Sequence, residues 1–263
     1  MRAKHLVALL TAVALWVAMP AKAELTEVDD IVVSFHGGFF PTSLPRHKPV
    51  PVRVHIAGDV KSASPGASPP HLESVTLGFN SASGASGQLS GLGLATCRKR
   101  AVQPGTEQMA RRRCGDALVG SGNVIIQVRY PEQKPFLNRV KILFYNSLTR
   151  HGHSRIFAQA YSKDPPTSFI VPVVVSRQKG TFGTTMTSTI PPGLSSFIYF
   201  KHFDMTLERT YFFHGKRRSL LSAACSAPVG FPGAIFPLAQ ITYGFDTGRS
   251  ITTTIIRSCS VRN

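Results

Sequence analysis

Two stretches, VIIQVRY at 124–130 and VKILFY at 140–145, decide the fold class of this 263-residue chain. Apolar side chains occupy alternate positions in both stretches: Val124, Ile126, Val128 and Tyr130 in the first, and Val140, Ile142 and Phe144 in the second. Successive side chains of a β-strand point to opposite faces of the sheet. This period of two therefore indicates strands with one buried face.

Outward from these stretches, further strand candidates have the same alternation or are short runs rich in Val and Thr, which pack well on a pleated surface. They lie at 52–56, 75–79, 155–160, 169–175, 182–190, 197–203, 210–213, 218–224, 235–245 and 251–259. Turn residues separate them. His214-Gly215-Lys216 and Asp246-Thr247-Gly248 are each expected to join two antiparallel strands.

One short helix is expected at 107–114. Thr106 can accept a hydrogen bond as its N-cap, and the Glu107 carboxylate suits the positive end of the helix dipole. Gly115 can end the helix.

Many short strands, frequent turns and one short helix predict an all-β fold, namely an antiparallel β-sandwich that is stapled by disulfides. Residues 24–263 are expected to form one domain, since all-β folds of ~200–250 residues often do so. Pro165-Pro166 marks either a boundary near residue 165 between two halves of the sandwich or a simple crossing between strands.

Residues 1–23 have the form of a signal peptide. Arg2 and Lys4 precede an apolar run from Leu6 to Met19, and Ala21-Lys22-Ala23 fits the small-x-small cleavage pattern. A retained membrane anchor is the rival interpretation, but the run is shorter than the roughly 20 residues that span a bilayer. We therefore expect a secreted or cell-surface protein with no transmembrane span after cleavage.

Four cysteines in an exported chain favour two disulfides. Three pairings are possible, and Cys97–Cys114 with Cys225–Cys259 is preferred because each bond joins neighbouring segments. No C-x-x-C spacing occurs, so neither a metal site nor any other cofactor is expected.

The chain is strongly basic, with 30 Lys and Arg against 13 Asp and Glu. Removing three cations with the signal lowers the net charge from +17 to +14. Such a charge favours anionic partners such as acidic polymers, lipid headgroups or nucleic acid, although it can also serve solubility alone.

The cations gather in candidate anion-binding clusters: Arg98, Lys99 and Arg100; Arg111, Arg112 and Arg113; and Lys216, Arg217 and Arg218. A Cys97–Cys114 bond would hold the first two clusters together. Arginine forks match phosphate and carboxylate groups. Aromatic side chains that could stack on bases do not accompany the clusters, so nucleic acid is the least favoured target. The competing interpretation is a set of solvated turns with nearby counter-charges, Glu107 and Asp116.

The cysteine segments also carry a resemblance. The run CGDALVGSG at 114–122, the run RRSLLSAAC at 217–225 and FDTG at 245–248 before Cys259 resemble a group of secreted, β-rich proteins of unknown function from high-GC Gram-positive bacteria. In that group the first cysteine loop ends in Cys-x-x-Ala-Leu-Val-Gly-x-Gly. The resemblance covers nearly all of the mature chain. It implies secretion and an all-β fold, and no activity.

No motif commits the chain to catalysis. Asp246-Thr247-Gly248 has the form of an aspartic-protease turn, but no second such turn exists, and a hairpin turn is the simpler interpretation. His151-Gly152-His153, with His36 or His55, lacks a clear third metal ligand.

These observations predict a non-catalytic secreted protein that binds anionic cell-surface or extracellular polymers. The alternatives are a secreted, acid-dependent hydrolase with an unrecognised site and a structural subunit of an extracellular complex. Oligomeric state is left open.

Overall fold

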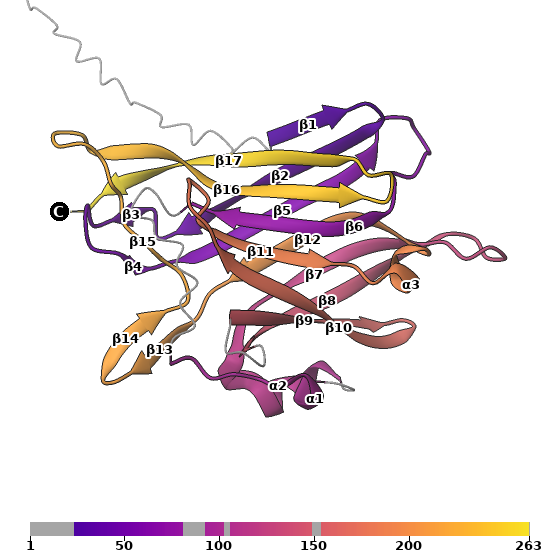
Figure 1. Ribbon diagram of the computed structural model, residues 1–263, viewed down its shortest axis with the longest axis horizontal. Helices are drawn as coiled ribbons and strands as arrows, with labels where there is room; N and C mark the ends of the chain where they lie inside the picture. Colours follow the sequence, from indigo (N-terminus) through magenta and orange to yellow (C-terminus); the bar gives the residue numbers. More distant parts are fainter. Residues whose placement is uncertain (1–23, 81–92, 103–105, 149–153, 263) are drawn as a thin grey trace, which may run out of the picture.

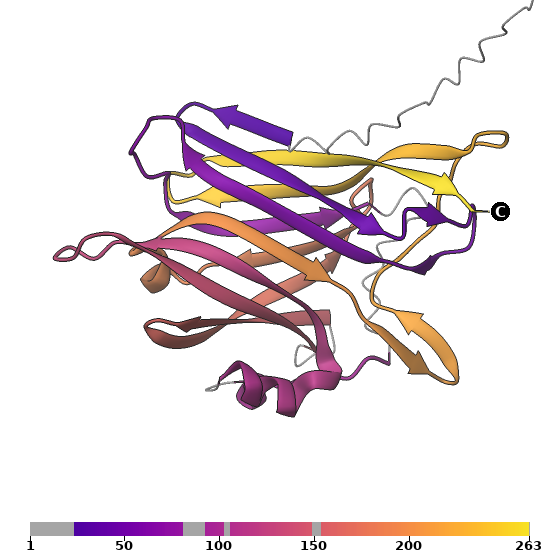
Figure 2. The same cartoon turned by 180° about the vertical axis from the view of Figure 1, so that it is seen from behind.

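A computed structural model describes residues 24–80, 93–102, 106–148 and 154–262 (Figures 1 and 2). Its main feature is one 13-stranded sheet whose strands pair antiparallel, except for a parallel contact between the last two in its order. The order across the sheet is β1 (Glu24–Val28), β2 (Ile31–Phe40), β5 (Arg53–Ser62), β12 (Ile198–Leu207), β7 (Leu118–Val128), β8 (Phe136–Leu148), β9 (Ser154–Lys163), β10 (Pro166–Arg177), β11 (Thr184–Thr189), β6 (Leu72–Phe79), β16 (Gly233–Phe245), β17 (Ser250–Val261) and β3 (Ser43–Leu44).

Smaller elements complete the described chain. Two further pairs of strands are β13 (Thr210–Phe213) with β14 (Lys216–Ser219), and β15 (Ser222–Ala223) with β4 (Val50–Pro51). The helices are α1 (Lys99–Val102), α2 (Glu107–Cys114), the 3-10 turn η1 (Gly115–Ala117) and α3 (Pro192–Ser195).

The sheet curls so that its two halves face each other and bury one face of nearly every long strand (Figure 1). Strand β17 comes to lie beside β1 and β2, which belong to the other half. Polar contacts join the two edges. Arg249, directly before β17, pairs with Asp29 and Asp30 of the β1–β2 turn, and the Ile256 amide of β17 donates to a carboxylate oxygen of Glu24 in β1. The result is the expected sandwich, made from one continuous sheet.

The alternation in the sequence explains which side chains are buried. Val124, Ile126 and Val128 of β7 all lie in the main core. On the same strand, Gly120 and Gly122 allow close approach to β12. A Cβ atom on Gly122 would lie 2.3 Å from the Asp204 carbonyl oxygen, so a larger residue there would push the two strands apart.

The predicted all-β fold and the helix at 107–114 are confirmed. Thr106 caps α2 as expected, accepting a hydrogen bond from the Met109 amide at 3.3 Å. The short helices α1 and α3 were not expected, nor were the strands β1 to β4. Pro165 lies between β9 and β10, which pair with each other. The proposed signal peptide lies outside the described residues.

Both preferred disulfides are present. Cys225 and Cys259 belong to the main core, whereas Cys97 and Cys114 belong to a second, smaller core beneath α1 and α2. The two bonds therefore stabilise different parts of the molecule.

Replacing each pair by serine should separate these roles. Without Cys225–Cys259, whose partners are 34 residues apart, the free energy of unfolding of the sheet should fall by about 3 kcal/mol. Without Cys97–Cys114, hydrogen exchange should accelerate mainly in α2, while amides of β16 and β17 keep their protection. Equal loss of protection throughout the chain in both variants would contradict two separate cores.

Candidate functional site

The helical lobe, defined as α1, α2 and η1, rests on the outer face of the sheet. Its small core joins Cys97 and the three elements of the lobe to β8. The buried members of this core are Cys97, Val102, Ala110, Cys114, Ala117, Leu143 and Tyr145. The same strand β8 sends Val140 and Phe144 into the main core. Both faces of β8 are therefore covered, which explains why its sequence is apolar at nearly every position from 142 to 145.

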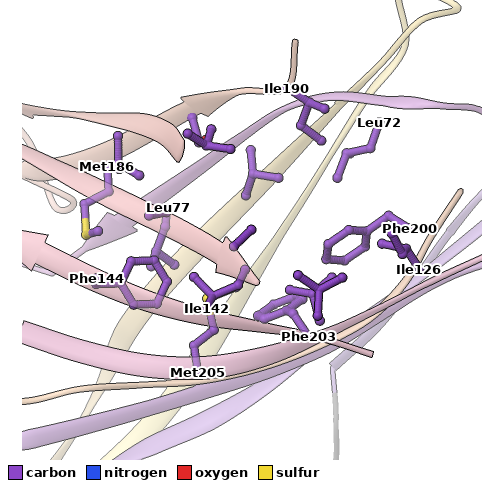
Figure 3. Close-up of a pocket in the computed structure, with 18 of the residues that line it drawn as sticks. Leu72, Leu77, Ile126, Ile142, Phe144, Met186, Ile190, Phe200, Phe203 and Met205 are labelled. Atoms are coloured by element: carbon purple, nitrogen blue, oxygen red, sulfur yellow. The ribbon is translucent and has the colours of Figure 1, made fainter. Parts of the chain in front are cut away.

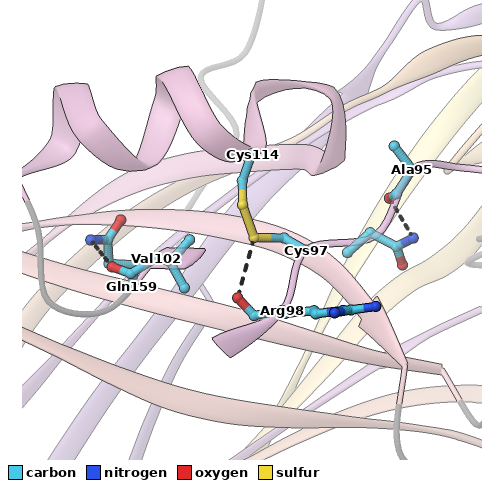
Figure 4. The surroundings of a disulfide bond; sticks show 7 residues. Ala95, Cys97, Arg98, Val102, Cys114 and Gln159 are labelled. Atoms are coloured by element: carbon cyan, nitrogen blue, oxygen red, sulfur yellow. Dashed lines mark hydrogen bonds between the residues drawn. A yellow bond between two sulfur atoms is a disulfide. The ribbon is translucent and has the colours of Figure 1, made fainter. Parts of the chain in front are cut away.

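Hydrogen bonds fix the lobe to the sheet around the Cys97–Cys114 bond (Figure 4). The Cys97 amide donates to the Asn146 carbonyl oxygen of β8 at 2.8 Å. The buried Gln159 side chain of β9 donates to the Val102 carbonyl oxygen at 3.1 Å, at the end of α1. These contacts hold the backbone that carries the first two basic clusters.

Five of the six cations near this disulfide are exposed: Arg98, Lys99, Arg100, Arg112 and Arg113. All thirteen carboxylate side chains lie in the described residues. None of them is within ion-pair distance of these five cations. The five positive charges are therefore balanced by solvent ions or by a ligand.

Arg111 differs from its neighbours because it has a partner. Its Nε lies 2.8 Å from Glu107 Oε1, and Lys141 Nζ of β8 lies 2.9 Å from the same oxygen. Burial alone would raise the pKa of Glu107, but the hydrogen bonds from Lys141 and Arg111 outweigh it and hold that pKa below its ordinary value of 4.5. Among the six cations near the disulfide, Glu107 therefore forms an ion pair with Arg111 alone.

The third cluster lies on the β13–β14 hairpin. His214 and Gly215 form its turn. Both residues have positive φ, as a type I′ turn requires. Lys216, Arg217 and Arg218 are exposed on β14.

The hairpin base contacts the helical lobe. Arg209, directly before β13, lies 3.8 Å from Asp116 of η1. At the turn end of the hairpin, Phe213 packs on Gly93, which precedes the lobe in the chain. A Cβ atom on residue 93 would lie 2.0 Å from the Phe213 ring. Both ribbon views place the lobe and the hairpin on the same side of the curled sheet (Figures 1 and 2).

The elements that carry the three predicted clusters therefore lie on one side of the curled sheet, and their exposed cations are here called the basic face. It comprises Arg98, Lys99, Arg100, Arg112, Arg113, Lys216, Arg217 and Arg218. Its members do not converge on a single point: Arg98 lies on the opposite side of the disulfide from α2 (Figure 4). The exposed cations are therefore spread over the lobe and the hairpin.

The string Asp246-Thr247-Gly248, which has the form of an aspartic-protease turn, lies in a different part of the chain from the basic clusters. Asp246 is exposed in the turn between β16 and β17, where the Gly248 amide donates to the Phe245 carbonyl oxygen at 3.0 Å. Gly248 has a φ of 76°, which explains the glycine in this hairpin. Asp-Thr-Gly is thus a turn in this chain.

Sequence reasoning missed a polar network on the outer face of β2, β5 and β12. Asp59 accepts a hydrogen bond from Ser34 Oγ at 2.9 Å and lies 3.1 Å from His202 Nδ1. His55 and Asp204 form a similar pair at 3.1 Å. The serine hydroxyl contacts the carboxylate and not the imidazole, so this histidine is not placed to activate it. Strand register brings these residues together across long sequence distances, so no local motif could reveal them.

Metal binding finds no support in the part of the chain that the structure describes, which holds no group of three or more potential ligands. His151 and His153 lie outside the described residues. None of the helices within the described ranges is long and apolar enough to cross a bilayer. The two disulfides indicate an oxidising environment.

Comparisons with known proteins identify no relative. No family model, curated protein or solved structure matches the chain.

The ion cluster around Glu107 makes the lobe sensitive to acid. The Glu107 pKa is lower in the folded state than its ordinary value of 4.5, so its stabilising contribution is complete above that value. That contribution is lost as the pH falls through the folded-state pKa. Glu107→Gln should lower the free energy of unfolding of the lobe by about 1 kcal/mol at pH 7. The difference in the free energy of unfolding between this variant and the unaltered protein should shrink below pH 4.5.

Hydrogen exchange of α2 at a series of pH values measures this difference. Glu132→Gln is the matched control, because Glu132 is exposed in the β7–β8 turn and has no ion-pair partner within the described chain. A Glu107→Gln effect that is independent of pH would show that the carboxylate acts through packing and not through its charge.

Proposed function

We propose that this is a non-catalytic, secreted protein that binds an anionic polymer at the cell surface or outside the cell through its basic face. The observation that carries the proposal is the set of five exposed cations beside the Cys97–Cys114 bond without a carboxylate in reach. Like charges held this close repel one another, and an anionic partner relieves that repulsion.

The construction of the face supports this proposal. A disulfide, a small apolar core and an ion pair at Glu107 hold the cations on elements that are packed against the sheet. Less side-chain and backbone freedom is therefore lost on binding than for a flexible basic tail. An extended surface of arginine and lysine suits repeated carboxylate, sulfate or phosphate groups.

The hydrolase alternative has lost its strongest sequence candidate, because Asp246 lies exposed in a hairpin turn. The alternative of a structural subunit has no specific observation in its favour. Both are weaker than anion binding for this chain.

Binding to heparin, used as a model acidic polymer, tests the proposal. Changing Lys99, Arg112 and Arg113 together to Gln should raise the Kd roughly 100-fold at low salt, since each cation near an anionic surface contributes about 1 kcal/mol. Affinity of the unaltered protein should fall steeply with salt concentration.

A matched control changes Lys163, Arg177 and Lys179 to Gln, which removes the same charge from exposed positions on and beyond β9 and β10. The control should raise the Kd less than fivefold. Equal weakening by both triple variants would mean that net charge alone drives binding and would overturn a specific basic face. Binding that persists in high salt would also contradict the proposal.

A further inference from the structure

Between the two halves of the sheet lies an apolar cavity of about 180 Å³ (Figure 3). Strands of both halves line it, together with Leu194 of α3. Figure 3 places Met186 and Phe144 at one end, and Ile190, Leu72 and Phe200 at the other. The lining residues are thus spread along the facing strands.

The sequence of β9 explains the space. This strand lies where the sheet curls over, and the side chains that it sends to the cavity belong to Ala158 and Ala160. Neighbouring strands contribute larger side chains at paired positions, such as Phe144 opposite Ala158 and Phe169 opposite Ala160. Two alanines at the bend leave a volume that leucine or phenylalanine would fill.

The cavity lining has few groups that could form hydrogen bonds with water. Apart from Ser188 and the phenol of Tyr243, every lining side chain is a hydrocarbon or a thioether. The Tyr243 hydroxyl already donates to the Ser34 carbonyl oxygen at 3.5 Å, and burial raises its pKa. Cavities with so few polar partners stay dry, which leaves the space available to an apolar ligand.

The two ends of the cavity differ in exposure. Phe144, Ala158 and Met186 are each at most 7% exposed, whereas Ile190, Leu194 and Ile198 at the α3 end are only half-buried. The four-residue helix α3 contacts both β6 and β12, and His71 Nδ1 lies 3.0 Å from the Ile198 carbonyl oxygen. The α3 end is therefore the thinner cover and the natural point of entry.

We infer that this cavity binds one unbranched alkyl chain, inserted from the α3 end with its polar head outside. An apolar cavity of about 150 Å³ is known to bind one benzene molecule, so about 180 Å³ holds roughly seven carbon atoms. A lining spread along two facing sheet layers suits an extended chain better than a compact ring. The inference does not depend on the basic face, which lies on the outside of the sheet.

A chain-length series on the unaltered protein tests this inference directly. Alkyl sulfates and alkyl glucosides from four to twelve carbons would be titrated, and their Kd values measured by calorimetry. Affinity should rise roughly fourfold for each added methylene until the cavity is full near seven or eight carbons, and then level off. Both head groups should give the same break point. No binding, or no dependence on chain length, would overturn the inference, as would binding of cyclooctane as tight as that of the eight-carbon chains.

Substitutions that fill the cavity beside β9 provide the structural control. Ala158→Leu and Ala160→Leu should each weaken binding of octyl glucoside at least tenfold, because the added side chain occupies the ligand volume. Ser154→Leu adds the same side chain at an exposed position of β9 and should leave binding unchanged. Unchanged binding in a folded Ala160→Leu variant, checked by its circular dichroism, would place the ligand elsewhere and refute the site.

Discussion

Burial of one face of a single sheet against itself is the constraint on which the rest of this structure depends. Among the described residues, the only other sheets are two pairs of short strands, so the thirteen-stranded sheet covers itself by curling until β17 lies beside β1 and β2. Most long strands then place alternate side chains in one shared core. The cavity, the position of the helical lobe and the separation of the two disulfides all follow from this curl.

The curl also explains why the protein has two separate cores. Strands β8 and β9 lie near the bend, and their outer face would be apolar and exposed without a cover. The helical lobe covers that face with Val102, Ala110 and Ala117, and Cys97–Cys114 holds the lobe together. Its basic residues can remain outside because its apolar residues are already buried. The eight residues of α2 therefore include both buried residues that pack on the sheet and basic residues on its outer side.

Local patterns in the sequence predicted most of the long strands and both disulfides. Alternation at 124–130 and 140–145 predicted β7 and β8, and the glycines after His214 and Thr247 predicted two hairpins. Strand β2 escaped notice because Gly37 and Gly38 interrupt its apolar residues. The strand order, the Asp59 network and the cavity depend on pairings between distant segments, which no local pattern specifies. Only the register assigns Ala158 and Ala160 to the inside of a bend.

The curled sheet closes over an apolar space at the β9 bend. A crystal structure determined under xenon pressure tests it most directly, because xenon enters dry apolar cavities without needing a polar partner. The account predicts xenon between Ala158, Ala160 and Phe203, within a curled sheet whose β17 lies beside β1 and β2. Ordered water at that position, or lining side chains repacked to fill the space, would contradict it.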